Sequence, residues 1–176
     1  MIIWFTGVSG SGKTTLSVAL VQALQQRGYS VHRVDGDAFR EKEKRENVFS
    51  REEIIENNLR IIEHVQSILN DYDIIIVSVI SPFEETRKKA REVFGQNLKE
   101  IFVDCPREIL ISRDPKGLYA KALRGEVKNL IGFSPESPYE PPENPDLKIR
   151  TDKVNVDHAT KTILDSFFHA DTERNP

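Results

Sequence analysis

The sequence predicts a three-layer α/β fold in which a parallel sheet is flanked by helices. Apolar, β-branched runs alternate along the chain with longer segments of helical periodicity, and short connections join them. The apolar runs are continuous instead of alternating with polar residues, which is typical of parallel strands that are covered on both faces.

The predicted elements follow one another as strand and helix. We expect strands at residues 2–6, 30–35, 74–79 and 100–104, and a weaker one at 147–150. We expect helices at residues 13–27, 51–70, 83–94, 107–112, 119–124 and 156–168. Gly28 would end the first helix, and Ser50 would cap the second, with Glu53 completing a capping box.

Length and composition predict one domain. The 176 residues suffice for a sizeable core. We expect the domain to span residues 1–170 and a frayed tail to follow at 171–176. With 28 acidic and 25 basic residues, no overall charge favours a nucleic acid or a membrane surface as partner. The longest apolar stretch, residues 74–80, is too short to cross a bilayer, and no targeting peptide fits before residue 7. We therefore expect a cytoplasmic protein.

The chain contains a single cysteine, Cys105. A lone cysteine excludes an intrachain disulfide and any metal site built from several cysteines, which suits a reducing cytosol. The simplest interpretation of Cys105 is a small buried residue at the end of the fourth strand.

A complete phosphate-binding loop lies between the first strand and the first helix. Residues 7–14 read GVSGSGKT and satisfy the pattern G-x-x-x-x-G-K-[ST]. In such a loop the backbone N–H groups cradle phosphates, the lysine reaches the β- and γ-phosphates, and the hydroxyl is placed to bind Mg²⁺. The alternative is a chance Gly/Ser-rich turn, which the flanking strand and helix argue against. We therefore predict a P-loop NTPase fold whose nucleotide-binding residues are Gly7, Val8, Ser9, Gly10, Ser11, Gly12, Lys13, Thr14 and Thr15.

Two carboxylates follow the second strand. Asp35 and Asp37 come at the carboxyl edge of the sheet, on the side of the phosphate loop, where open α/β sheets bind their ligands. Asp35 would hold the hydrated Mg²⁺ together with Thr14, and Asp37 would accept a proton from an attacking hydroxyl. Arg40 would meet an anionic acceptor. The alternative is a solvated acidic turn, because Asp-Gly is common in turns.

Basic residues gather downstream of the fourth strand. Residues 113–119 read RDPKGLY, and Lys121, Arg124 and Lys128 follow. Phosphoryl transfer needs cations near the transferred group and exclusion of water, so we predict a basic lid over about residues 113–133. The alternative is an ordinary charged helix face.

Six segments match the motifs of one known family, in family order and over nearly the whole chain. They are IWFTGVSGSGKTT (3–15), VDGDAFR (34–40), VSVISPF (77–83), FVDCP (102–106), RDPKGLYAKALRGEVKNLIGF (113–133) and PYEPPENPDL (138–147). The chain thereby resembles the adenylyl-sulfate kinases, which phosphorylate the 3′-hydroxyl of adenosine 5′-phosphosulfate with MgATP. The phosphate loop is generic to P-loop proteins, whereas the last two segments are much more specific.

The resemblance implies a role for each cluster. It gives the catalytic group as Lys13, Asp35, Asp37 and Ser81, and it places Cys105 and Arg113 near the base of ATP. Ser81 matches a serine that is described in this family as a phosphoserine intermediate. A serine that ends a strand equally well caps the backbone, and in-line transfer assisted by an aspartate needs no covalent step. The residues implied for the acceptor are Asp37, Arg40, Phe49, Asn57, Ile80, Ser81, Lys116, Leu118, Lys128 and Phe133, with the two phenylalanines stacking on its adenine.

The chain departs from the family pattern on the acceptor side. Ala38 stands where asparagine is usual, residues 42–44 replace a Gly-Leu-Asn turn, and Ile54 replaces a substrate-binding arginine. Three functions therefore stay open. The leading one is an adenylyl-sulfate kinase of sulfate assimilation. The second is a paralogous kinase for another nucleotide with a small anionic tail, such as a modified cytidine diphosphate. The third is a silent nucleotide-sensing domain, which the intact phosphate loop and acidic pair argue against. A homodimer is expected from the resemblance alone.

Overall fold

In the computed structural model, which describes residues 1–42 and 50–168, five parallel strands form one sheet. The strands are β1 (Ile2–Thr6), β2 (Val31–Asp35), β3 (Ile74–Ser78), β4 (Leu98–Asp104) and β5 (Leu147–Arg150). Their order across the sheet is β2-β3-β1-β4-β5. The chain therefore moves to one side after β1 and to the other side after β3, and such a reversal opens a crevice at the carboxyl ends of these two strands.

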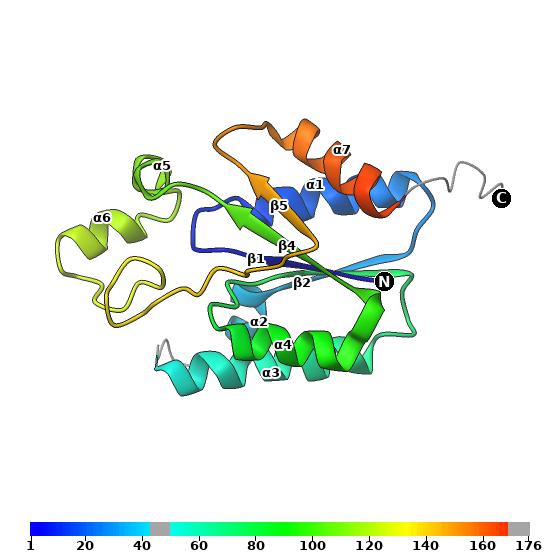
Figure 1. The fold of residues 1–176 in the computed structure, drawn as a ribbon, viewed down its shortest axis with the longest axis horizontal. Coiled ribbons are helices and arrows are strands. Elements are labelled where there is room, and N and C mark those ends of the chain that lie inside the picture. Colours follow the sequence, from blue (N-terminus) through cyan, green and yellow to red (C-terminus); the bar gives the residue numbers. More distant parts are fainter. Residues whose placement is uncertain (43–49, 169–176) are drawn as a thin grey trace.

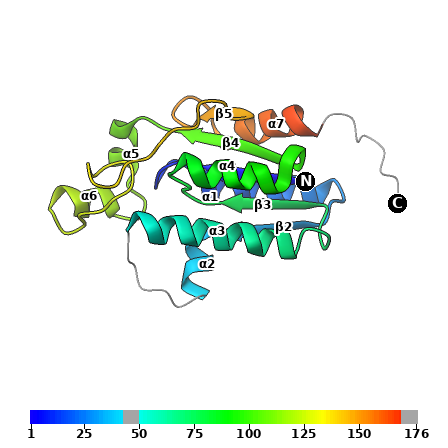
Figure 2. The same ribbon diagram turned by 60° about the horizontal axis from the view of Figure 1, so that its bottom comes forward.

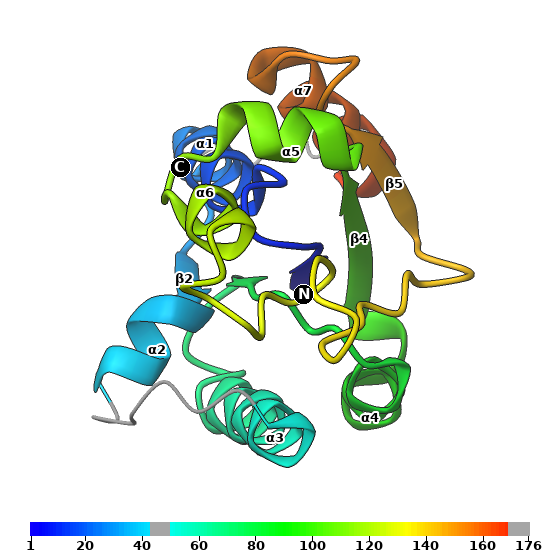
Figure 3. The same cartoon turned by 90° about the vertical axis from the view of Figure 1, so that its left-hand side faces the viewer.

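Helices cover both faces of the sheet (Figure 1). The helices α1 (Lys13–Gln26) and α7 (Val156–Phe167) lie on one face. The other face carries α3 (Arg51–Ser67) and α4 (Glu84–Phe94), which Figure 2 brings forward. Three short helices gather at the carboxyl end of the sheet, which faces the viewer in Figure 3: α2 (Gly36–Lys42), α5 (Arg107–Arg113) and α6 (Leu118–Leu123). A 3-10 turn, Gly95–Asn97, joins α4 to β4.

The side chains of β1 explain why its apolar run is continuous. Ile3 and Phe5 pack into the cluster formed with α1 and α7, whereas Ile2 and Trp4 pack into the cluster formed with α3 and α4. All four side chains are at most 1% exposed. Because both faces of a central parallel strand are buried, every position along it is apolar.

The predicted α/β fold is confirmed, with element ends that differ from the expected ones by a few residues. Ser50 caps α3 as predicted, since its hydroxyl accepts from the N–H of Glu53 at 3.2 Å and the Glu53 side chain accepts from the N–H of Ser50. Gly28 follows α1 at φ +82° and donates its N–H to Gln25, as expected of a helix stop.

One helix was not expected. Residues 36–42 form α2, although Asp-Gly-Asp is typical of a turn. Asp35 Oδ1 accepts from the N–H groups of Asp37 at 3.1 Å and Ala38 at 3.4 Å, which satisfies the first turn of the helix. The acidic motif is therefore a helix start. The predicted tail lies outside the described residues, and within them no helix is long and apolar enough to cross a membrane.

Candidate active site at the carboxyl edge of the sheet

The phosphate loop, residues 7–14, follows β1 and ends on the first turn of α1. Its backbone folds back on itself: the N–H of Ser11 donates to the carbonyl of Val8 at 3.2 Å, and Lys13 Nζ donates to the same oxygen at 2.8 Å. Gly7 cannot carry a side chain, because a Cβ would lie 2.5 Å from the carbonyl oxygen of Val103 on β4. The buried Ser11 hydroxyl finds no partner among the described residues. A curled backbone, a free hydroxyl and an inward lysine fit a phosphate chain.

Lys13 is the buried cation of this loop, with 8% of its surface exposed. Burial lowers the pKa of Lys13 to about 7, although the negative charge of Asp37 opposes the shift. A phosphate beside Nζ would favour the charged form. Nucleotide binding and protonation of Lys13 are therefore coupled.

Asp35 and Asp37 occupy different environments at the end of β2. Asp35 caps α2, and its Oδ2 accepts from Arg33 at 2.7 Å. Asp37 Oδ2 accepts from Lys116 of the lid at 2.5 Å, while Asp37 Oδ1 lies 4.0 Å from Arg40. Burial would raise the pKa of Asp37, but the hydrogen bond from Lys116 and the nearby positive charges lower it below its ordinary value. Asp37 is therefore ionised at neutral pH, and its carboxylate already forms an ion pair with the ammonium group of Lys116.

The segment that the sequence predicts as a lid, residues 113–133, lies against the phosphate loop and α2 at the end of the sheet shown in Figure 3. The Tyr119 hydroxyl donates to the carbonyl of Ser9 at 2.7 Å. Gly132 lies so close to Val8 that a Cβ there would come within 2.5 Å of the valine Cγ1. These two contacts and the ion pair between Lys116 and Asp37 hold the predicted basic segment against the phosphate loop.

Cys105 follows β4, Arg113 is the last residue of α5, and the two side chains contact each other. Arg113 Nη1 lies 3.6 Å from Cys105 Sγ, and its Nη2 donates to the carbonyl of Thr151 at 2.7 Å. The Thr151 hydroxyl in turn donates to the carbonyl of Ser11 at 2.8 Å. Cys105 is buried as predicted. This chain of contacts connects both residues to the phosphate loop.

Ile80 and Ser81 form the turn after β3, beside the loop. The carbonyl of Ile80 accepts from the Thr6 hydroxyl at 2.7 Å and from the N–H of Gly7 at 3.3 Å. Ser81 is fully buried, has a positive φ of 47°, and its hydroxyl has no partner among the described residues. Its backbone, more than its hydroxyl, defines this part of the site.

The other residues predicted for the acceptor are distributed unevenly. Asn57 is 6% exposed on α3, and its Oδ1 accepts no hydrogen bond from the described residues. Leu118 packs into the apolar cluster of the lid, whereas Lys128 is exposed. Phe49 lies outside the described residues.

Phe133 is held between two neighbours. The guanidinium of Arg107 lies 4.1 Å from the centroid of its ring, and Tyr119 meets the ring edge-on with centroids 5.6 Å apart. One face of the predicted stacking residue is therefore covered by a cation.

Sequence reasoning missed three side chains that shape this edge: Thr6, Arg87 and Tyr139. The Tyr139 hydroxyl lies 2.9 Å from that of Thr6, and Arg87 donates to the carbonyl of Ser81 at 2.8 Å. These contacts join segments that are far apart in the sequence. Thr6 lies in the motif at residues 3–15 and Tyr139 in the motif at residues 138–147, but these motifs indicated a family and no contact.

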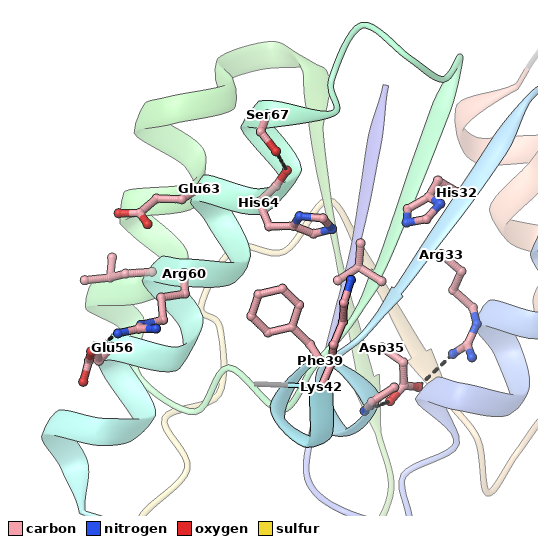
Figure 4. Close-up of a pocket in the computed structure, with 13 residues that line it drawn as sticks. His32, Arg33, Asp35, Phe39, Lys42, Glu56, Arg60, Glu63, His64 and Ser67 are labelled. Atoms are coloured by element: carbon pink, nitrogen blue, oxygen red, sulfur yellow. Dashed lines mark hydrogen bonds and ion pairs between the residues drawn. The ribbon is translucent and has the colours of Figure 1, made fainter. Parts of the chain in front are cut away.

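A hollow lies between β2, α2 and α3 (Figure 4), and Asp35 is among the residues that line it. It measures about 950 Å³, and its lining mixes aromatic and charged side chains, among them His32, Phe39, Lys42 and His64. Neither Lys13 nor Asp37 lines it. A smaller cavity of about 160 Å³ lies under the lid and is lined by Val8, among other residues. Charge and donor geometry, more than volume, place the chemistry at the phosphate loop.

The fold and the site define a nucleotide-binding protein of the P-loop kinase class. A parallel sheet carries a phosphate loop with an inward lysine after β1, a carboxylate after β2, and a basic segment that contacts both. These groups together suit phosphoryl transfer.

Comparison with known proteins narrows this class. The adenylylsulphate kinase family model matches residues 1–150. The adenylyl-sulfate kinase of Chloroflexus aurantiacus is 45% identical over 165 residues, covering 93% of this chain and 87% of that protein. The enzyme of Halothermothrix orenii is 43% identical over 164 residues, covering 93% and 86%. The chain belongs to the adenylylsulphate kinase family.

A solved relative supports the same placement. The structure of the Mycobacterium tuberculosis APS kinase, in complex with AMPPNP and APS, superimposes with a TM-score of 0.83 at 35% identity. The alignment covers 95% of this chain and 96% of that chain.

The buried Lys13 predicts proton uptake on nucleotide binding. At about pH 8 the free protein holds much of Lys13 neutral, because its pKa of about 7 lies below this pH, and the phosphates of AMPPNP would restore the charge. Titration calorimetry in buffers of different ionisation enthalpy should show uptake of a fraction of a proton, and affinity should weaken as pH rises above 7. Lys13→Arg is the matched control, because a guanidinium stays charged. Equal uptake by both proteins would contradict the assignment.

Proposed function

We propose that this protein is an adenylyl-sulfate kinase. It transfers the γ-phosphoryl group of ATP to the ribose 3′-hydroxyl of adenosine 5′-phosphosulfate, giving 3′-phosphoadenylyl sulfate for sulfate assimilation. The observation that carries the proposal is the placement of Asp37 beside the phosphate loop, where its charge acts on the buried Lys13, in a chain of this family.

The nucleotide side of the reaction rests on the phosphate loop. Backbone N–H groups of residues 7–14 bind the phosphates, and Lys13 leaves the carbonyl of Val8 to neutralise the β- and γ-phosphates. Arg113, fixed on Thr151, and Cys105 line the side toward the base of ATP. Transfer needs little covalent chemistry from the protein, so positioning and charge supply most of the catalysis.

The acceptor side rests on Asp37. As the 3′-oxygen forms its bond to the γ-phosphorus and the bond to the β-phosphate oxygen breaks, the hydroxyl proton passes to the Asp37 carboxylate and ADP leaves. In the structure Lys116 Nζ donates to Asp37 Oδ2 at 2.5 Å. We infer that Lys116 moves to a phosphate when both nucleotides are bound, which frees Asp37 to accept the proton.

The residues present fit Mg²⁺. The side chain of Thr14 is exposed at the start of α1. The Asp35 carboxylate, which accepts from Arg33 and from the first N–H groups of α2, would meet the hydrated ion through a water. Mg²⁺ retains several waters and is usually bound through one or two protein ligands and substrate phosphates, so a larger cluster of acidic residues is not needed. Bound there, the ion would neutralise charge on the phosphates.

Ser81 fits a backbone role. Its side chain is fully buried and its hydroxyl has no partner among the described residues, so no base is placed to activate it as a nucleophile. We propose that Ser81 shapes the turn beside the acceptor and carries no phosphate during turnover.

Arg40 is the proposed anion contact of the acceptor. It lies on α2, 4.0 Å from Asp37, whereas Ile54 occupies the position of the usual second arginine. Asn57, Ile80, Leu118, Lys128, Phe133 and Phe49 complete the proposed acceptor set. We further propose that the enzyme is a cytoplasmic homodimer.

An acceptor panel tests the proposed activity. ADP formation from MgATP should be stimulated by adenosine 5′-phosphosulfate and unchanged by cytidine diphosphate derivatives or by buffer alone. Lys13→Ala is the control for contaminating ATPases, and its turnover should fall by about 10³–10⁵, the scale of charge stabilisation in phosphoryl transfer. Stimulation by a cytidine nucleotide alone would assign the second function, and no stimulation by any acceptor would assign a sensing domain.

Substitution of Asp37 tests the base. Asp37→Asn keeps the shape of the side chain but removes its basicity, so kcat should fall about 10²–10⁴-fold. The KM for ATP should change little, because the phosphate loop is intact. Ser81→Ala serves as the comparison and should be far milder. A severe loss in Asp35→Asn with a mild one in Asp37→Asn would reverse the two roles, and a severe loss in Ser81→Ala would favour a covalent step.

A further inference from the structure

The turn after β3 is held in an unfavourable backbone conformation. Ser81 adopts a φ of 47°, a region that side chains other than glycine rarely occupy. Such strain persists only where the surroundings fix the backbone, and it is typical of functional sites.

Each carbonyl of the turn accepts a short hydrogen bond from a different residue, and the Thr6 hydroxyl also lies 3.3 Å from the carbonyl of Ser81. Ile80 is bound by the Thr6 hydroxyl at 2.7 Å, Ser81 by Arg87 Nη1 at 2.8 Å, and Pro82 by the N–H of Glu140 at 2.8 Å. The donors come from β1, from α4 and from the segment that follows the lid. Three separate parts of the chain thus converge on one turn.

Arg87 is the buried member of this set. It is 2% exposed, its Nε lies 3.1 Å from Glu100 Oε1 on β4, and its Nη2 pairs with Glu84. Burying an arginine and a glutamate together is seldom stabilising compared with apolar side chains of similar size. Stability alone therefore gives a weak reason for a charged residue here, whereas a fork that holds the Ser81 carbonyl gives a specific one.

The turn borders the place where the two nucleotides would meet. The carbonyl of Ile80 accepts from the N–H of Gly7, the first residue of the phosphate loop, at 3.3 Å. β3 and β1 are also the neighbouring strands at which the strand order changes sides: β2 and β3 lie on one side of β1, and β4 and β5 lie on the other. A shift of this turn would move one wall of the crevice relative to the phosphate loop.

We propose that Arg87 is a positioning residue for the acceptor nucleotide, acting through the carbonyl of Ser81. The inference rests on the proposed kinase function. Arg87 fixes the turn at Ile80 and Ser81 so that the acceptor hydroxyl lines up with the γ-phosphate, while Lys13 and its loop hold ATP independently.

The test separates acceptor from ATP kinetics. Arg87→Met keeps the length of the side chain and removes the donors, so kcat/KM for adenosine 5′-phosphosulfate should fall about 10- to 100-fold, the effect of a displacement of roughly 1 Å. The KM for ATP should stay close to that of the wild type. Arg87→Lys keeps the charge but cannot reach all three partners at once, so it should recover part of the loss.

Arg91→Met is the matched control. Arg91 Nη2 pairs with the same Glu100 at 2.9 Å and with Asp146, lies on the same helix, and donates to no carbonyl of the turn in the described structure. Its acceptor kinetics should match the wild type even if its thermal unfolding temperature falls. Thermal unfolding of all variants reports folding separately from kinetics.

The outcomes decide the inference. Equal acceptor kinetics in Arg87→Met and Arg91→Met would overturn it, as would a parallel loss for ATP and acceptor. If Arg87→Met does not fold, Arg87→Lys decides, because wild-type acceptor kinetics in that variant would also overturn it. A wild-type protein that ignores adenosine 5′-phosphosulfate would contradict the proposed function instead, and the same variants would then be measured with the acceptor it uses.

Discussion

The parallel pairing of β1 with β3 is the constraint on which the site depends. It places the phosphate loop, which follows β1, beside the turn that follows β3, and the N–H of Gly7 donates to the carbonyl of Ile80 across the gap. The Thr6 hydroxyl reinforces this contact. Because β2 pairs with β3 in the same direction, Asp35 and Asp37 arrive at the same edge. The phosphate loop, the proposed base and the proposed acceptor wall are therefore positioned by one sheet register.

The two buried cations near this crevice, Lys13 and Arg87, have different surroundings. Lys13 is desolvated with no carboxylate in direct contact in the described structure, so its charge is most favourable when a phosphate arrives. Arg87 is buried and contacts the buried Glu100, the more exposed Glu84 and the carbonyl of Ser81, so its position is fixed. The first arrangement suits binding, and the second suits holding a backbone in place. The exposed pair of Lys116 and Asp37 is the adjustable contact, because a solvent-exposed ion pair contributes little stability and exchanges partners easily.

The sequence was sufficient to predict a parallel sheet, the succession of strands and helices along the chain, the phosphate loop and the family. These features are local, since apolar runs and the G-x-x-x-x-G-K-[ST] pattern carry them. It was insufficient for α2, where Asp35 caps a helix that reads as a turn, and for Thr6, Arg87 and Tyr139. Those residues matter through contacts between distant segments, which no local pattern encodes. The departures at Ala38 and Ile54 lie on α2 and α3, on the side proposed for the acceptor.

Under the proposed function, both nucleotides meet in this one crevice and the phosphoryl group passes directly between them. The stereochemistry at phosphorus tests it most directly. With ATP made chiral at the γ-phosphorus by oxygen isotopes and sulfur, a single in-line transfer with Asp37 as base should give product with inverted configuration. Retention of configuration would show two successive transfers through a phosphorylated residue, and it would contradict the account.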